Sequence, residues 1–144
     1  MITVNFRELE LGEFWHDEAP RDRGRGGFPL VTAEGTENLG MVYFEIAPGD
    51  SLGMHTDSKD ELVIVLSGDA VATIGDEHGE LVAGMAAFVP AMVPHGFTNI
   101  GTETLKVIGV FAGTPITATF RYPLQPWGTH AVEIKSPAAL AVAT

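Results

Sequence analysis

Four side chains able to bind a divalent metal lie in two short segments of the chain. His55, Asp57 and Glu61 fall within MHTDSKDELVIVL, and His95 lies in VPHGF. Residues two apart on a strand point to the same face, so His55 and Asp57 would share one wall. Imidazole nitrogen and carboxylate oxygen are the usual ligands of a divalent metal that keeps open positions for substrate. With His95 as a further nitrogen ligand, the pattern predicts a metal site.

A charged turn is the simpler interpretation of the first segment. An isolated HTDSKDE sequence is more typical of a polar turn than of a site, because short motif matches carry a high false-positive rate. The five apolar residues Leu62–Leu66 that follow read as a core strand, which would put the polar cluster at the mouth of that strand. The site interpretation therefore needs a second matching segment.

Short β-strands must position these side chains. GMVYFEIA (40–47) reads as a strand that ends at the turn sequence PGD. Further strands are indicated by SLGMHTD, ELVIVLSG, DAVATIG, LVAGMAAFVPA, PHGFTNIG, ETLKVIGVFAG and ITATFRY, with SGDA and DEHGE as turns. About eight strands spaced roughly 8 to 12 residues apart predict an all-β sandwich or barrel.

The two ends of the chain lack this alternation. Residues 7–30 hold Arg21, Arg23 and Arg25 in RDRGR, and such a charge run flanked by glycine is usually a solvated loop. An anion-binding lid over a pocket mouth is the other interpretation. The tail SPAALAVAT (136–144) is small and apolar, which is typical of a short helix or a frayed end.

Composition argues against several classes of partner. The 144 residues include 19 Asp and Glu against 8 Lys and Arg, a formal net charge of −11, and so acidic a surface repels nucleic acid. No apolar run reaches membrane-spanning length, and acidic residues stand near the start where a secretory signal needs an apolar stretch. The chain has no cysteine and therefore no thiolate chemistry. We expect a cytoplasmic enzyme or binding module for a small molecule.

Two motifs in the chain resemble those of the cupin family. The first family motif is a Gly, five residues, His-x-His, three or four residues, Glu, six residues and Gly. Here it reads G-DSLGM-HTD-SKD-E-LVIVLS-G from Gly49 to Gly68, with Asp57 where the second His usually stands. The second motif is a Gly, five residues, Pro-x-Gly, two residues, His, three residues and Asn. Here it reads G-MAAFV-PAM-VP-H-GFT-N from Gly84 to Asn99, with Met92 in place of the middle Gly.

The resemblance implies a double-stranded β-helix, the jelly-roll barrel of the cupins. We accordingly expect a single cupin domain over residues 1–144, with a core barrel at about 40–122, an N-terminal arm at 1–39 and a C-terminal tail at 123–144. Cupins are often homodimers, so a homodimer is expected. The resemblance also implies a metal inside the barrel, held by the motif residues His55, Glu61 and His95.

Asp57 departs from the family pattern, and three interpretations stay open for it. It could ligate through oxygen, it could hydrogen-bond a ligand histidine, or the site could have lost its metal. Because Glu61 matches the family's carboxylate in type and spacing, we rank it ahead of Asp57 as a ligand. Whichever carboxylate is not a ligand is the candidate proton-transfer base. The expected cofactor is one divalent ion, Fe2+, Mn2+, Zn2+ or Ni2+, bound by His55, Asp57, Glu61 and His95.

A barrel of this size can enclose one small ligand. Apolar side chains are more often core than substrate contacts, but Tyr43 and Trp127 each carry a polar atom that needs a partner when buried. The possible wall groups are Met41, Tyr43, Phe88, Met92, Phe97, Phe111 and Trp127. From these we expect substrate contacts at Tyr43, Met92, Phe97 and Trp127.

The function expected from these features is a metal-dependent enzyme. A site of two histidines and one carboxylate can bind dioxygen and a chelating enol, catecholate or β-dicarbonyl, which indicates a non-haem dioxygenase acting on an enolisable or aromatic metabolite. Cupins also include lyases, isomerases and polyketide cyclases, so a non-redox reaction is the first alternative. A cupin that binds a small ligand without turnover is the second.

Overall fold

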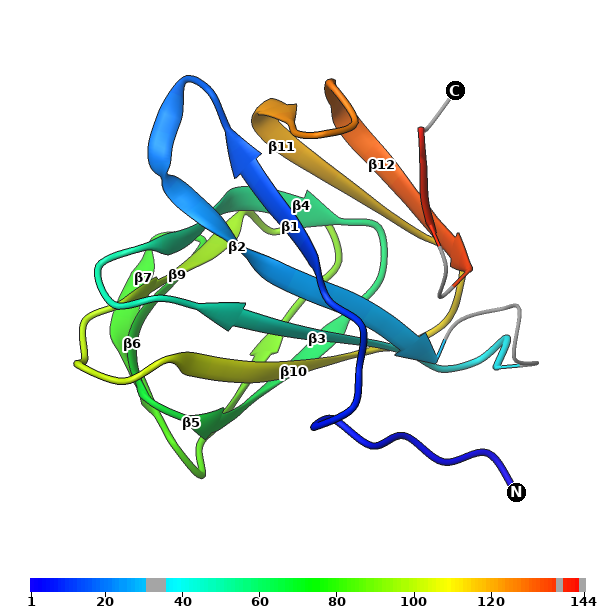
Figure 1. Cartoon of the computed structure of the whole chain (residues 1–144), viewed down its shortest axis with the longest axis horizontal. Helices are drawn as coiled ribbons and strands as arrows, with labels where there is room; N and C mark the ends of the chain where they lie inside the picture. The colour runs from blue at the N-terminus through cyan, green and yellow to red at the C-terminus, as the bar shows by residue number, and fades with distance from the viewer. Residues whose placement is uncertain (31–35, 137–138, 143–144) are drawn as a thin grey trace.

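The regular secondary structure of the described part of the protein is all β-strand. The computed structural model describes residues 1–30, 36–136 and 139–142, and no helix occurs among them. The strands are β1 Gly12–His16, β2 Ala19–Leu30, β3 Gly40–Ile46, β4 Ser51–Asp57, β5 Glu61–Ser67, β6 Asp69–Ile74, β7 Glu77–Val82, β8 Ala86–Val89, β9 His95–Asn99, β10 Leu105–Phe111, β11 Ile116–Leu124, β12 Thr129–Ser136 and β13 Ala139–Val142 (Figure 1).

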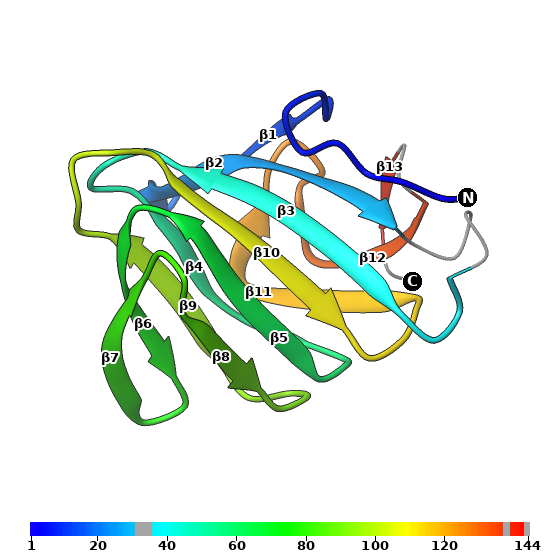
Figure 2. The ribbon, with the colours of Figure 1, turned by 90° about the horizontal axis from the view of Figure 1, so that it is seen from below.

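The strands form two layers. One runs β1-β2-β3-β10-β5-β8 and the other β13-β12-β11-β4-β9-β6-β7. Figure 2 shows β2, β3, β10 and β5 side by side as one curved layer. A parallel pair at Asp22 and Ser51 joins β2 to β4 and so connects the layers. The expected all-β jelly-roll barrel is confirmed.

Alternating burial along the strands fills the space between the layers. In β5, Glu61, Val63 and Val65 are buried, whereas Leu62 and Leu66 are exposed, as a half-buried strand requires. Two apolar clusters result, one around Phe44, Ile46, Val63 and Leu105, the other around Phe111, Ile116, Phe120 and Val132. Phe14, Val42 and Leu52 pack against both clusters. These three side chains therefore connect the two apolar clusters.

Residues 12–16 and 19–30 are strands, so the solvated loop expected for the charge run of Arg21, Arg23 and Arg25 is wrong. β2 pairs with β3 in a register that sets Arg25 opposite Glu45, and the two side chains form an ion pair of 2.6 Å. Arg21 and Arg23 contact the buried carboxylate of Asp50 at 3.0 and 3.6 Å. Sequence alternation fails here because the half-buried positions between the exposed arginines are Asp22, Gly24 and Gly26, where a half-buried strand usually carries apolar side chains.

Two further boundaries differ from expectation. DEHGE is not a turn throughout, because β7 already begins at Glu77, and the expected strand LVAGMAAFVPA is divided between β7 and β8 around Gly84, whose φ is +89°. At the C-terminus β12 pairs with β11 and β13 with β12, so residues 139–142 are not helical. Residues 137, 138, 143 and 144 of the tail lie outside the described part. In the segments described, no helix is long and apolar enough to cross a membrane.

Candidate metal centre

Three strands bring the four predicted metal-binding side chains together. His55 and Asp57 share the buried face of β4, as the i, i+2 spacing predicts. The β4–β9 register sets His95 directly opposite His55, and their ring centroids are 4.2 Å apart. Glu61 is the first residue of β5 and pairs with Phe111 of β10. All four side chains are buried.

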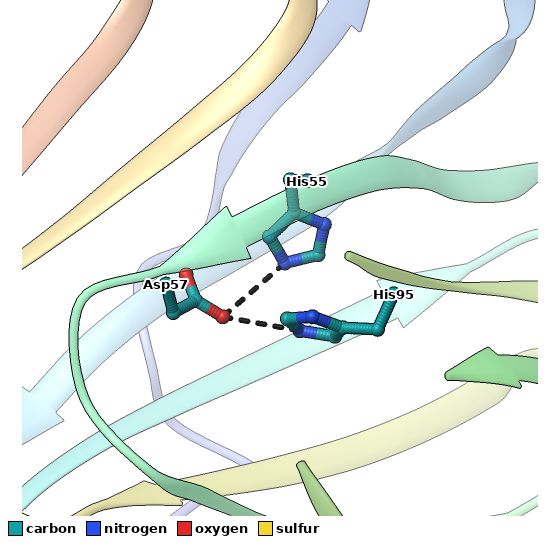
Figure 3. A group of neighbouring side chains, drawn as sticks. All are labelled: His55, Asp57 and His95. Carbon is teal, nitrogen blue, oxygen red and sulfur yellow. Dashed lines mark ion pairs between the residues drawn. The ribbon is translucent and has the colours of Figure 1, made fainter. Parts of the chain in front are cut away.

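Asp57 is the centre of the cluster. Its Oδ2 lies 3.4 Å from Nε2 of His55 and 3.1 Å from Nε2 of His95 (Figure 3). Oε1 of Glu61 lies 3.3 Å from Nε2 of His95. His55, Asp57 and His95 offer ligand atoms that all lie within 4.8 Å of one another. Asp57 therefore contacts both histidines and Glu61 only one, whereas the sequence ranks Glu61 first as a ligand; which carboxylate binds the metal stays a prediction.

Backbone carbonyls hold both imidazoles through the same ring nitrogen, Nδ1. Nδ1 of His55 donates to the carbonyl of Gly53 at 2.8 Å, and Nδ1 of His95 donates to the carbonyl of Val93 at 2.9 Å. A carbonyl oxygen can only accept, so Nδ1 carries the proton in each ring. Each Nε2 therefore faces the carboxylates and is the atom available to a metal, an orientation typical of metal-binding histidines.

The cluster has buried polar atoms that no hydrogen bond satisfies. Oδ2 of Asp57 and Nε2 of His95 have no well-oriented hydrogen-bond partner among the described residues, although they lie in ion-pair contact. Unsatisfied buried groups of this kind are rare because they cost free energy. A divalent cation between them would satisfy both, so the residues present fit a metal.

The buried charges shift one another's pKa. Burial acts to raise the pKa of Asp57, but the adjacent His55 and His95 rings hold it well below its usual range. Burial raises the pKa of Glu61, and the charge of Asp57 adds to this effect. Burial acts to lower the pKa of His95, but its contacts with Asp57 and Glu61 outweigh that effect and raise it to about 10. The two carboxyls therefore differ in acidity, as in many acid–base pairs.

A cavity of about 510 Å³ opens beside this cluster. Of the four expected substrate contacts, Phe97 and Trp127 line it. Tyr43 is on the other face of β3, where its hydroxyl donates to Glu45 at 2.6 Å, and Met92 is 61% exposed in the turn before β9. Neither lines the cavity. Among the other wall groups considered, Phe111 lines it, whereas Met41 and Phe88 do not.

Two features of the site are not predicted by the sequence. Gly109 of β10 leaves space for the Glu61 carboxylate, since a Cβ at Gly109 would collide with Oε2 of Glu61. The ring of Phe120 stacks on His55 with centroids 4.8 Å apart. The buried alternation of Val107, Gly109 and Phe111 places Gly109 on the inner face, but only the β5–β10 register reveals its neighbour.

The second motif also has structural roles. The amide of Asn99 donates to the carbonyls of Ile46 and Glu103, both at 2.8 Å, and so ties β9 to neighbouring segments. Met92 donates its N–H to the carbonyl of Asp57 at 2.8 Å. The turn before β9 therefore fixes the end of β4, where Asp57 lies.

Comparison with known proteins identifies the class. A cupin domain model matches residues 42–111, and an uncharacterised protein of Streptomyces coelicolor is 33% identical over 66% of this chain and 88% of its own length. The chain belongs to the cupin superfamily. Auxin-binding protein 1 of Arabidopsis thaliana is 28% identical over 69% of this chain, which spans 58% of that protein.

Solved structures share the fold at low identity. The polyketide cyclase RemF from Streptomyces resistomycificus superposes with a TM-score of 0.64 at 22% identity, covering 81% of this chain and 83% of that one. An oxalate decarboxylase from Lactobacillus farciminis, solved as a formate complex, gives a TM-score of 0.67 at 19% identity over 80% of this chain and 34% of that one. These similarities establish the fold, and the reaction must be inferred from the residues of the site.

Proposed function

We propose that this protein is a metal-dependent enzyme of the non-haem dioxygenase type, acting on an enolisable or aromatic small molecule. The observation that carries the proposal is the convergence of two imidazole nitrogens and one carboxylate oxygen within 4.8 Å, beside a cavity large enough for a small molecule. Two histidines and one carboxylate with open positions are typical of non-haem iron oxygenases.

Each side chain of the cluster has a proposed role. His55, Asp57 and His95 would hold the ion, which is Fe2+, Mn2+, Zn2+ or Ni2+. When bound, the ion supplies Lewis acidity that makes an enol or phenol more acidic and, for a redox-active ion, reactivity with dioxygen. Glu61 contacts His95 alone among the histidines of the cluster and lines the cavity. It therefore serves as the base that receives the substrate proton, or as a fourth ligand.

Two other functions fit specific observations. A non-redox lyase, isomerase or cyclase would use the same residues without dioxygen, and the fold similarity to a polyketide cyclase supports considering it. A ligand-binding protein without turnover is supported by similarity to a protein named for auxin binding. Four buried ionisable groups are costly to assemble for passive binding of an apolar ligand, which favours an enzyme.

Metal analysis with oxygen uptake tests the proposal. We expect about one divalent ion per chain by elemental mass spectrometry, removal of most of it by His95→Ala, and no loss in the matched control His78→Ala, whose exposed ring lies on β7. Fe2+-loaded protein should consume dioxygen with an enol or catechol substrate, measured with an oxygen electrode. Turnover by Zn2+-loaded protein without oxygen uptake would establish the non-redox alternative instead.

We also propose that the protein is a cytoplasmic homodimer. The outer face of β5 and β8 exposes Leu62, Leu66 and Phe88, and exposed apolar patches often mark protein interfaces. Light scattering during gel filtration should give twice the 15.3 kDa chain mass. A monomer mass at micromolar concentration would refute the dimer without affecting the metal site.

A further inference from the structure

The cavity beside the cluster collects most of the aromatic side chains of the protein. Six of the eight phenylalanines in the chain line it, together with Trp127. These residues are Phe14, Phe28, Phe44, Phe97, Phe111 and Phe120. Aromatic walls bind planar rings through offset and edge-to-face contacts. The lining thus favours a flat, apolar ligand body over a sugar or a small hydrophilic acid.

The charged groups of this lining are all negative or metal-binding. Glu10, Asp57 and Glu61 contribute carboxylates, and no Lys or Arg occurs among the described lining residues. A phosphate or a second carboxylate on a ligand would be buried there with no cationic partner, and burying an unpaired charge is strongly unfavourable. The basic side chains Arg21, Arg23 and Arg25 pair with Asp50 and Glu45 and are not part of this lining.

We propose that the substrate is a planar aromatic ring system, fused or extended beyond a single ring, that carries one chelating pair of oxygens and no phosphate, sulfonate or additional carboxylate. The inference rests on the proposed function, because the chelating edge is assigned to the His55, Asp57 and Glu61 side chains of the lining. The volume of about 510 Å³ is in the range of pockets that enclose drug-sized ligands. A single ring such as catechol would leave much of the aromatic wall without contacts.

Three probes with one chelating head separate these contributions. Catechol supplies the head, 2,3-dihydroxynaphthalene adds a ring, and its 6-sulfonate adds a fixed negative charge. Zn2+-loaded protein keeps dioxygen chemistry out of the measurement, and elemental analysis after titration verifies that the ion is retained. By calorimetry or tryptophan fluorescence, the naphthalenediol should bind at least about tenfold more tightly than catechol and about tenfold more tightly than the sulfonate.

A positive charge introduced into the cavity lining tests whether the missing cation excludes the sulfonate. Phe28→Arg should remove most of the discrimination against the sulfonate, whereas Ile100→Arg, at an exposed position outside the cavity, should leave the discrimination unchanged. Leu11→Arg, at another lining position, is the second variant if Phe28→Arg does not fold. Circular dichroism and retained zinc confirm that each variant is folded before its affinities are compared.

The outcomes separate this inference from the proposed function. Equal binding of catechol and the naphthalenediol by zinc-loaded protein overturns the substrate class but leaves the metal site intact. Equal binding of the diol and its sulfonate does the same. Metal-free protein can be tested with phenol and 2-naphthol, which lack the chelating pair. A preference for 2-naphthol in a protein that binds no metal supports the aromatic cavity and overturns the proposed metal-dependent function alone.

Discussion

His55 and His95 lie directly opposite each other across the β4–β9 pair, and each donates its Nδ1 proton to the carbonyl two residues before it. This repeated arrangement turns both Nε2 atoms toward the same carboxylate, Oδ2 of Asp57. The backbone therefore sets the direction of both imidazoles before any ligand binds. A preformed site of this kind binds metal without first reorganising its side chains.

Metal uptake should release a proton from His95. Contacts with Asp57 and Glu61, opposed by burial, raise the pKa of His95 to about 10, so the metal-free protein holds a proton on Nε2 at neutral pH. A metal replaces that proton, and its affinity should rise about tenfold per pH unit between pH 6 and 8. Zinc titration in buffers of different ionisation enthalpy measures the released protons. A dissociation constant independent of pH in this range would contradict the assignment.

The same shift gives the metal-free protein a pH-dependent stability. A folded-state pKa above the unfolded value of 6.5 for His95 stabilises the fold fully below pH 6.5, and this contribution disappears as pH rises toward 10. Denaturant unfolding of metal-free protein should therefore show a stability loss between these values. His95→Gln should lack that loss, and a wild-type profile as flat as that of the variant would disprove the linkage.

Asp57 and Glu61 should differ in their effect on metal affinity. Asp57 contacts both histidines, whereas Glu61 contacts only His95. We expect Asp57→Asn to weaken zinc binding on the order of a hundredfold and Glu61→Gln by less than about tenfold. Competition with a chromophoric chelator measures both constants, and Glu80→Gln on the exposed face of β7 is the control. The reverse order would restore Glu61 as the main carboxylate ligand.

The convergence of the four candidate site residues could be predicted from the sequence, but the contacts among them could not. The residue types and spacing of two motifs single out His55, Asp57, Glu61 and His95 as candidates. The distances among their side chains depend on the register of β4 against β9 and of β5 against β10. A shift of one residue in either register would reverse which face carries them. Sequence alone does not determine that register.

The N-terminal strands and the cavity wall show a second limit. β2 lies beside β3 through pairs such as Arg25 with Glu45, which no local periodicity encodes, because partner strands are distant in sequence. Tyr43 was expected to contact substrate, yet the alternation of β3 places Val42 and Phe44 in the cavity lining and Tyr43 on the opposite face. A strand buried on both faces does not reveal from its sequence which face is inner.

Met92 should be replaceable by glycine with a gain in stability. Its φ of +66° is in the left-handed region, where a residue with a side chain pays about 1–2 kcal/mol, while its side chain is 61% exposed. Glycine removes that strain but costs roughly 0.5–1 kcal/mol in backbone entropy. We expect Met92→Gly to raise the free energy of unfolding by up to about 1.5 kcal/mol. Met92→Ala, which retains the strain, should give no gain in the same denaturant titration, and equal effects of Gly and Ala would refute the explanation.

Gly109 should be a positioning residue for Glu61. A Cβ at this position would collide with Oε2 of Glu61 and would lie 2.7 Å from Cγ1 of Val42, so the carboxylate or the valine must move. Overpacking of this kind costs about 1–3 kcal/mol, and we expect Gly109→Ala to lower the melting temperature and to displace Glu61 from His95. Gly79→Ala on β7, where the added Cβ meets no atom within 4 Å, is the matched control for changing a strand glycine.

The pH dependence of zinc affinity distinguishes a displaced Glu61 from a general loss of packing. Moving Glu61 away removes one of the two carboxylates that raise the pKa of His95. In the Gly109→Ala variant, His95 should therefore lose its proton at a lower pH than in the wild type. A variant that is merely less stable would keep the wild-type pH dependence of zinc affinity.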